Sequence, residues 1–235
     1  MRSVREHCGL KDAGCSVKSE STVAAALTGQ LYEFDYGCGT SMGKVLVGVD
    51  EVGRGPLAGP VVAAAVILDP DTPIQGINDS KKLSALQRER LFGEIAAHAR
   101  EWAVGSADPE EIDRINILQA TLAAMHRAIG KLTNHWDRVL IDGNQKIRSI
   151  PAELQQTVVR GDGTSASIAA ASIIAKVTRD RLMQQYHATF PDYGFDVHKG
   201  YGTELHRNRI KQYGLCSLHR KSFCSSLVLQ TTLEF

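Results

Sequence analysis

The chain has 235 residues, of which 43% are hydrophobic and 23% are charged, and its formal net charge at pH 7 is +1. These values are typical of one globular domain, which at this length buries enough apolar surface to fold without a metal or disulfide. The sequence lacks both an apolar run of the roughly 18 residues that a membrane span needs and a secretory leader. We therefore expect a cytoplasmic protein.

The five cysteines are odd in number and none forms a C-x-x-C pair. Neither a zinc site nor a disulfide framework is indicated by this pattern. A metal site built from His7, Cys8 and Cys15 is conceivable, but reduced thiols are the better interpretation in the cytoplasm.

Residues 1–41 show no sustained periodicity and mix glycine, serine, threonine and charged residues. We interpret them as a poorly ordered N-terminal extension, or as the product of a start codon chosen upstream of Met42. Residues 42–224 then form the single predicted domain, and residues 225–235 form a C-terminal tail.

The first half of the predicted domain alternates short apolar runs with helical segments. β-branched runs bounded by glycine and proline are typical of buried strands, while a Ser-x-x-Gln pattern or an Asp-Pro pair marks a helix start. In chain order, these patterns predict strands at Lys44–Asp50 and Val61–Leu68, a helix at 84–100, a strand at Glu101–Ala107, and a helical stretch at 109–132 that breaks near Asn116.

The second half continues the alternation. It contains predicted strands at Arg138–Asp142 and Gln156–Arg160, a long helix at Ser165–Phe190 and a basic helix at Thr203–Tyr213. Strands that first cluster and then alternate with helices indicate an α/β fold, a mixed β-sheet flanked by helices with a C-terminal helical segment.

A glycine-rich segment, residues 53–60 (GRGPLAGP), joins the first two strands. It is longer than a tight hairpin requires, and ordering glycine is entropically costly. We therefore expect this segment to have a functional role.

Acidic residues follow three of the predicted strands. Asp50 and Glu51 end the first strand, Asp142 ends a later one, and Asp162 follows the last. Ligand sites on open α/β sheets lie at the carboxyl ends of strands, so these four side chains are candidates to converge. Because neighbouring residues of a regular strand face opposite sides, we expect the first strand to end at Glu51.

Clustered carboxylates repel one another and are stable together when cations neutralise them. An all-oxygen set favours Mg²⁺ or Mn²⁺, and two such ions about 4 Å apart can activate a water and stabilise a phosphate in reaction. The alternative, that these acids are turn formers and helix caps, stays open because a sequence does not show convergence.

The stretch from His198 to Lys221 is strongly basic, with Glu204 its only acid. Such a segment either tracks nucleic-acid phosphates or forms a solvated helix face. Its cationic residues are Lys199, Arg207, Arg209, Lys211, Arg220 and Lys221.

Several motifs, in matching order from about Val45 to Phe223, resemble those of the ribonuclease HII family. They are Asp50–Pro60 (DEVGRGPLAGP, similar to the family's DEAGRGPLAGPV), Asn78–Leu83 (NDSKKL), Ile141–Gly143 (IDG), Gly161–Gly163 followed by Ser165–Lys176 (SASIAAASIIAK), and His198–Thr203 (HKGYGT). The chain departs from the family at Val52, where alanine is usual, and residues 1–41 have no counterpart.

The resemblance implies an RNase H-like fold and a catalytic, metal-binding set formed by Asp50, Glu51, Asp142 and Asp162. This set would bind Mn²⁺ or Mg²⁺, with two ions expected.

The resemblance also implies that Gly53, Arg54 and Gly55 read the ribose 2′-hydroxyl and that Tyr201 stacks on the adjoining deoxyribose. Only the 2′-hydroxyl distinguishes RNA from DNA at such a site, and glycine lets the backbone approach it closely.

Four further residues have two readings each. Three lysines, Lys81, Lys82 and Lys176, are candidate phosphate contacts, and the alternative is ordinary solvated side chains. His198 is either a proton shuttle near the leaving group or a hydrogen-bonded loop histidine.

The implied activity is that of a monomeric endoribonuclease. It would cut the RNA strand of RNA–DNA hybrids and incise at ribonucleotides embedded in duplex DNA, leaving 3′-hydroxyl and 5′-phosphate ends. The alternatives are a DNA-cutting nuclease or resolvase on the same fold, and a non-catalytic hybrid-binding protein.

The last six residues, Gln230–Phe235 (QTTLEF), resemble the Q-x-x-L-x-F peptides that dock on the replication sliding clamp. An extended tail with leucine and phenylalanine anchors is suited to a groove on a partner, and a frayed terminus is the alternative.

Overall fold

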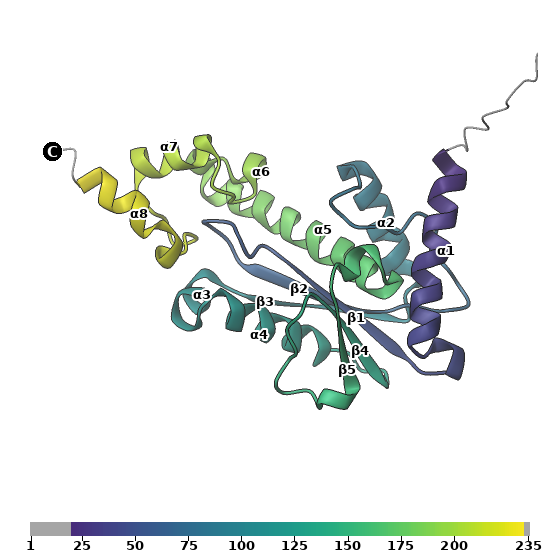
Figure 1. The fold of residues 1–235 in the computed structure, drawn as a ribbon. Helices are drawn as coiled ribbons and strands as arrows, with labels where there is room; N and C mark the ends of the chain where they lie inside the picture. Colours follow the sequence, from purple (N-terminus) through teal and green to yellow (C-terminus); the bar gives the residue numbers. More distant parts are fainter. Residues whose placement is uncertain (1–19, 233–235) are drawn as a thin grey trace, which may run out of the picture.

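A five-stranded sheet lies at the centre of the computed structural model, which describes residues 20–232 (Figure 1). The spatial order of the strands is β3-β2-β1-β4-β5; β1 pairs antiparallel with β2 and parallel with β4. The predicted mixed sheet is therefore confirmed. In chain order the strands are β1 (Leu46–Val52), β2 (Val61–Ile67), β3 (Glu101–Ala107), β4 (Arg138–Asp142) and β5 (Gln155–Val158).

Helices cover both faces of the sheet, and a helical segment extends from one end of it (Figure 1). One face packs against α2 (Ala85–His98) and α5 (Ala166–Thr189), and the other against α3 (Pro109–Ile115) and α4 (Ile117–Ile129). The extending segment contains α6 (Phe195–His198), α7 (Glu204–Tyr213) and α8 (Lys221–Thr232). Within residues 20–232, no helix combines the length and apolar character needed to cross a membrane.

Strand β2 shows how the two cores are divided. Val61, Ala63 and Ala65 pack on the α4 side, whereas Ala64 and Val66 pack on the α5 side, as the period-two alternation of a strand requires. All five are fully buried because helices cover both faces.

Close approach between β1 and α5 depends on Gly48. A Cβ added at this position would lie 2.0 Å from the carbonyl carbon of Ser167, so a larger side chain would push the helix away. This contact fixes α5 against the strand that carries Asp50 and Glu51.

Helix α1 (Glu20–Cys38) contradicts the expectation that residues 1–41 are poorly ordered, as far as residues 20–41 are concerned. Leu31 is 1% exposed, and the Tyr32 hydroxyl accepts a hydrogen bond from the Ile74 N–H at 2.9 Å. The helix was missed because its apolar residues form no clear stripe. Residues 1–19, with the conceivable site at His7, Cys8 and Cys15, lie outside the described residues.

Asp35 of α1 reinforces the N-terminus of α5, whose N-cap is Ser165. Its two carboxylate oxygens accept hydrogen bonds from the Ser165 hydroxyl at 2.5 Å and the Ser167 N–H at 2.8 Å. Ser165 is the N-cap and Ser167 lies in the first turn, where backbone N–H groups lack helical acceptors and an anion is favourable. The N-terminal helix is thereby joined to the helix that crosses the sheet.

Helix α8 begins at Lys221 and ends at Thr232, so the predicted boundary between domain and tail at residue 224 falls inside a helix. The predicted tail, residues 225–235, is helical over residues 225–232, so the extended conformation expected for Gln230–Phe235 is wrong for residues 230–232. Leu233–Phe235 lie outside the described residues.

Candidate active site

The four candidate carboxylates lie around the carboxyl end of β4. Asp50 and Glu51 are consecutive in β1, Asp142 is the last residue of β4, and Asp162 lies in the short 3₁₀ helix Gly161–Gly163. Burial raises the pKa values of both carboxyls of β1; repulsion from Glu51 and Asp142 adds to the rise at Asp50, and repulsion from Asp142 adds to it at Glu51. Burial also raises the pKa of Asp142, with a further contribution from Asp162. The fold thus brings together acids from three separate stretches of the sequence.

Strand β1 continues through Glu51, so the expectation that it ends there is wrong. Its register with β2 runs on to Val52, opposite Val62. Asp50 and Glu51 therefore point to opposite faces of the sheet. Both are within electrostatic reach of Asp142, which follows Ile141, the residue that pairs with Val49 in the parallel register of β1 and β4.

Asp50 is the most deeply held of the four, with 4% of its surface exposed. Its Oδ1 accepts a hydrogen bond from the Glu51 N–H at 2.7 Å, and its carboxylate is bound by the side chain of Ser172 from α5. Burial, then repulsion from Glu51 and Asp142, holds the pKa of Asp50 well above its ordinary value. Its position is therefore fixed at a substantial electrostatic cost.

Arg54 partly offsets the charge on Glu51 through an ion pair of 3.2 Å between Nη1 and Oε1. Burial still raises the pKa of Glu51, with a further contribution from Asp142. Burial likewise raises the pKa of Asp142, although its Oδ1 accepts a hydrogen bond from the Gly161 N–H at 2.6 Å.

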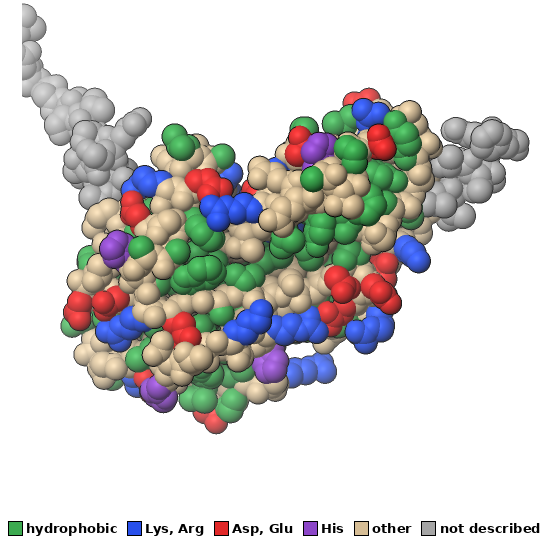
Figure 2. Space-filling view, turned by 180° about the vertical axis from the view of Figure 1, so that it is seen from behind, with side chains coloured by type: hydrophobic (Ala, Val, Ile, Leu, Met, Phe, Trp, Pro, Cys, Tyr) green, Lys and Arg blue, Asp and Glu red, His purple; other side chains and the backbone are tan. Residues whose placement is uncertain are grey.

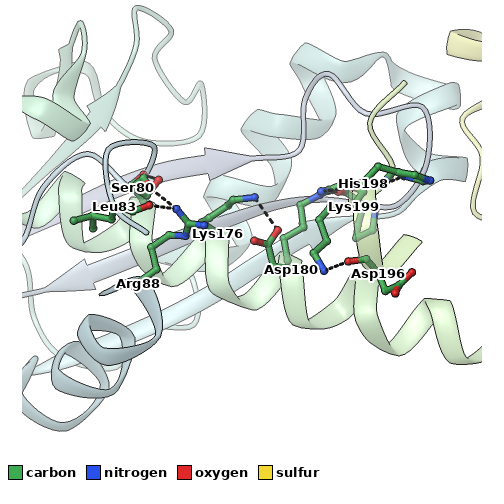
Figure 3. Close-up of polar contacts among 12 residues, drawn as sticks. Ser80, Leu83, Arg88, Lys176, Asp180, Asp196, His198 and Lys199 are labelled. Atoms are coloured by element: carbon green, nitrogen blue, oxygen red, sulfur yellow. Dashed lines mark hydrogen bonds and ion pairs between the residues drawn. The ribbon is translucent and has the colours of Figure 1, made fainter. Parts of the chain in front are cut away.

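Lys81 reaches the cluster from the loop before α2. Its Nζ lies 2.9 Å from Oδ2 of Asp162, while 78% of the lysine side chain is exposed. Within the described residues, the other two candidate lysines form no ion pair with the four carboxylates: Lys82 is exposed, and Lys176 pairs with Asp180 on α5 at 2.8 Å (Figure 3). Arg54 and Lys81 thus act as internal counterions.

Three aspartates and one glutamate form an all-oxygen donor set, which suits hard divalent cations. Within residues 20–232, no three His, Cys, Asp or Glu side chains are already arranged as a ligand shell around one ion. The ion pairs explain this, since Asp162 is directed to Lys81 and Glu51 to Arg54. The four carboxylates are chemically suitable ligands for a divalent ion. To bind one, Glu51 and Asp162 must release Arg54 and Lys81.

A cavity of about 90 Å³ adjoins two of the four carboxylates, those of Glu51 and Asp142. It is lined by Glu51, Arg54, Asp142, residues 143–145 and the side of α4. A second cavity, of about 220 Å³, lies between α1 and the amino end of β1. The second cavity contains none of the four acids and has no part in this site.

The glycine-rich segment 53–60 lies beside the loop that carries Tyr201. Leu57 donates its N–H to the carbonyl of Gly200 at 2.9 Å. The Tyr201 side chain is 41% exposed, and the Arg179 guanidinium lies 5.8 Å from its ring centroid. An accessible aromatic ring therefore stands next to the glycine segment that follows Asp50 and Glu51.

His198 supports this loop with both ring nitrogens. Nδ1 accepts a hydrogen bond from the Gly200 N–H at 3.1 Å, so Nε2 carries the proton and donates it to the Tyr193 carbonyl at 2.8 Å. The ring is buried and stacks on His206 with centroids 4.3 Å apart, and burial lowers its pKa. The structure favours the loop histidine over the proton shuttle.

Two residues important to this region had no recognisable sequence pattern. Arg179 and Arg220 are each 0% exposed and donate to backbone carbonyls of the glycine segment. Both readings of the basic stretch, phosphate tracking and a solvated helix face, require an exposed Arg220, and its burial contradicts both for this residue. A buried arginine and a solvated one have the same local sequence, so no signal distinguished them.

Comparison with known proteins identifies the family. The family model described as Ribonuclease HII matches residues 47–226. The chain is 53% identical over 184 residues to ribonuclease HII of Coxiella burnetii (strain RSA 493 / Nine Mile phase I), covering 78% of this chain and 90% of that protein. It is 54% identical over 185 residues to ribonuclease HII of Burkholderia thailandensis, covering 77% and 84%.

Solved structures with this fold include ribonuclease H2 from Pyrococcus horikoshii OT3, with a TM-score of 0.67 and 26% identity over 80% of this chain and 99% of that one. RNase HII of Archaeoglobus fulgidus, solved in complex with PCNA, has a TM-score of 0.64 and 28% identity over 75% and 93%. Bst-RNase HIII, solved with Mn²⁺, shares the fold at a TM-score of 0.65, 21% identity and coverage of 89% and 74%. The chain belongs to the ribonuclease HII family.

Proposed function

We propose that this ribonuclease H, besides cutting the RNA strand of RNA–DNA hybrids, incises at single ribonucleotides embedded in duplex DNA and leaves 3′-hydroxyl and 5′-phosphate ends. Membership of the ribonuclease HII family supports the first of these activities, endonuclease cleavage of RNA–DNA hybrids. The observation that carries the rest is the convergence of four carboxylates from three stretches of the chain next to a glycine-rich loop.

Asp50, Glu51, Asp142 and Asp162 are the residues that would hold Mg²⁺ or Mn²⁺. Bound divalent ions would supply Lewis acidity, lowering the pKa of a water and neutralising charge on the scissile phosphate. The protein's part is to keep these carboxyls close in spite of their repulsion. Ser172 and the N–H groups of Glu51 and Gly161 do this by fixing Asp50 and Asp142.

Lys81, Lys82 and Lys176 are proposed to contact substrate phosphates. The Lys81 side chain is largely exposed although it pairs with Asp162. When divalent ions bind Asp162, Lys81 can leave this carboxylate and contact a substrate phosphate. The surface is hollowed between the end that holds α1 and α2 and the end that holds the C-terminal helices, with basic side chains on both flanks (Figure 2). A duplex lying there would cross α5, which carries Lys176 (Figure 3).

Recognition of the ribose 2′-hydroxyl is assigned to Gly53, Arg54 and Gly55, with Tyr201 stacking on the neighbouring deoxyribose. A Cβ added at Gly55 meets no atom within 4 Å, so nothing inside the protein requires glycine there. Glycine at position 55 is instead explained by a substrate that approaches the backbone closely. The exposed ring of Tyr201 lies beside this segment, where it can pack against a sugar.

The test is cleavage of three duplexes that differ only in their sugars: an RNA–DNA hybrid, a DNA duplex with one ribonucleotide, and an all-DNA duplex. We expect the first two to be cut in Mg²⁺ or Mn²⁺, the third to stay intact, and chelator or Asp142→Asn to abolish cleavage. Cutting of the all-DNA duplex would favour a DNA nuclease, and binding without cutting would favour a hybrid-binding protein.

Gln230–Phe235 is proposed to dock on a sliding clamp. The relative from Archaeoglobus fulgidus was solved in complex with PCNA, and this chain ends in a Q-x-x-L-x-F pattern. Deleting the six residues should abolish clamp binding measured by calorimetry while cleavage of a short duplex is retained. Absence of binding by the intact chain would end the idea. We expect the enzyme to act in the cytoplasm as a monomer.

A further inference from the structure

Arg179 and Arg220 are buried without an acidic partner. Both are 0% exposed, and within residues 20–232 neither forms an ion pair with a carboxylate. Burial and the proximity of Arg179 lower the pKa of Arg220 to about 9, which leaves it protonated at pH 7. Burying two cations in this way costs several kcal/mol unless many hydrogen bonds offset it.

The donors of Arg220 are directed to the glycine segment. Nη2 donates to the carbonyls of Gly53 at 2.6 Å and Gly59 at 2.8 Å, Nη1 donates to that of Arg54 at 2.9 Å, and Nε donates again to Gly59 at 3.0 Å. One planar guanidinium thus holds both ends of the segment from inside.

Arg179 completes this arrangement from α5. Nε donates to the carbonyl of Pro60 at 2.9 Å, Nη2 to that of Ala58 at 3.1 Å, and Nη1 to that of Lys199 at 2.9 Å. It therefore joins the glycine segment to the loop that carries Tyr201.

The direction of these carbonyls determines the direction of the neighbouring amides. In a trans peptide the C=O of one residue and the N–H of the next point to opposite sides. With the carbonyls of Gly53 and Arg54 turned inward to Arg220, the N–H groups of Arg54 and Gly55 are turned away from it. Within the described chain, neither N–H has a hydrogen-bond acceptor.

The packing leaves little room for another arrangement. A Cβ added at Gly53 would lie 2.3 Å from Nε of Arg179, and one added at Gly200 would lie 2.3 Å from the Ala58 carbonyl oxygen. An apolar core would fix a loop at a lower desolvation cost than two buried cations. Unlike an apolar core, the two guanidinium groups fix the direction of the loop's peptide groups: the carbonyls of Gly53 and Arg54 point to Arg220, and the N–H groups that follow them point away from it.

We propose that Arg220, supported by Arg179, is a positioning residue for ribose recognition: it holds the carbonyls of Gly53 and Arg54 inward so that the amides of Arg54 and Gly55 face the 2′-hydroxyl. This inference rests on the proposed incision at ribonucleotides. It adds a specificity determinant that acts through the loop and contacts no substrate itself.

The first test compares Arg220→Lys with a matched control, Arg100→Lys, whose arginine pairs with Asp69 away from the loop. Both changes keep the positive charge. Binding is measured in chelator for two duplexes that differ by a single 2′-hydroxyl, and kcat/KM is measured in Mg²⁺ for the ribonucleotide-containing duplex.

Arg220→Lys should reduce the preference for the ribonucleotide-containing duplex by about tenfold, the factor expected for losing one average hydrogen bond. Affinity for the all-DNA duplex should stay within about twofold, because phosphate contacts are untouched. Arg100→Lys should change neither quantity. An Arg220→Lys enzyme that retains the wild-type preference would overturn the proposal.

A second measurement uses the wild-type protein and does not depend on the variant folding. The amide NMR signals of Arg54 and Gly55 should shift more on binding the ribonucleotide-containing duplex than on binding the all-DNA duplex. Equal shifts would also overturn the proposal. A wild type that neither prefers nor cuts the ribonucleotide-containing duplex would instead contradict the proposed function.

Discussion

Gly53→Ala and Gly55→Ala introduce the same methyl group two residues apart, and the structure predicts different consequences for each. Gly53 has a φ of +92°, and its added Cβ would lie 2.3 Å from Nε of Arg179 and 2.9 Å from the carbonyl oxygen of Pro60. At Gly55 the φ is outside the left-handed region, and no heavy atom lies within 4 Å of the added Cβ.

The magnitudes follow from these contacts. Left-handed backbone costs alanine about 1–2 kcal/mol, and overpacking against a buried side chain adds about 1–3 kcal/mol. Gly53→Ala should therefore lower the free energy of unfolding by about 2–5 kcal/mol. Gly55→Ala should change it by no more than about 0.5 kcal/mol, as expected for an exposed site without strain.

Gly55→Ala should reduce cleavage activity while leaving the free energy of unfolding nearly unchanged. A methyl group placed where the ribose approaches displaces the reacting phosphate, and a displacement of about 1 Å costs about 100-fold in rate. Denaturant unfolding and kcat/KM on the single-ribonucleotide duplex provide the two readouts. Wild-type cleavage by Gly55→Ala would refute the assignment of this glycine to substrate approach, and a large loss of stability would refute the described loop geometry.

Two further predictions concern the buried acids. Without divalent ions, Asp50→Asn should be more stable than the wild type at pH 8, because burial and the repulsion from Glu51 and Asp142 raise the pKa of Asp50. The folded wild type holds this proton more tightly than the unfolded chain, so its stability is lost as the pH rises through the raised pKa of Asp50. The extra stability of Asp50→Asn should therefore shrink as the pH falls towards 4. A difference in melting temperature that is the same at all pH values would contradict this. Asp35→Ala should lower the free energy of unfolding by about 1–3 kcal/mol, because the first turn of α5 loses its buried acceptor, and Asp35→Asn by less. Unchanged denaturation curves would mean that α1 does not stabilise the domain.

Local chemistry made most of the fold predictable. The Ser84 and Gln87 pattern gives the capping box at the start of α2, and the predicted break at Asn116 is observed with a φ of +67°. The strand Glu101–Ala107 was predicted at its observed bounds. Each of these features is decided by residues within a few positions of one another, so the sequence contains the information directly.

Features that depend on distant partners were not predictable. Asp35 binds the N-terminus of a helix that begins about 130 positions later, and Arg220 donates to carbonyls about 160 positions earlier. The types and strand-end positions of the four acids indicated a metal site. Their convergence follows from the parallel pairing of β1 with β4, which no local pattern shows.

The most direct measurement is a thermal melt of the metal-free protein during titration with Mg²⁺ or Mn²⁺, for the wild type and Asp142→Asn. Asparagine retains an acceptor for the Gly161 N–H, so the change removes charge and leaves this hydrogen bond. At about 100 times the Kd, binding stabilises by about 2.7 kcal/mol, or about 5–10 °C in Tm for a chain of this size. We predict such a shift for the wild type, a smaller one for Asp142→Asn, and a metal-free Tm of the variant that equals or exceeds that of the wild type. A strongly destabilised metal-free variant with an undiminished metal response would show that Asp142 is a structural cap and contradict the proposed carboxylate site.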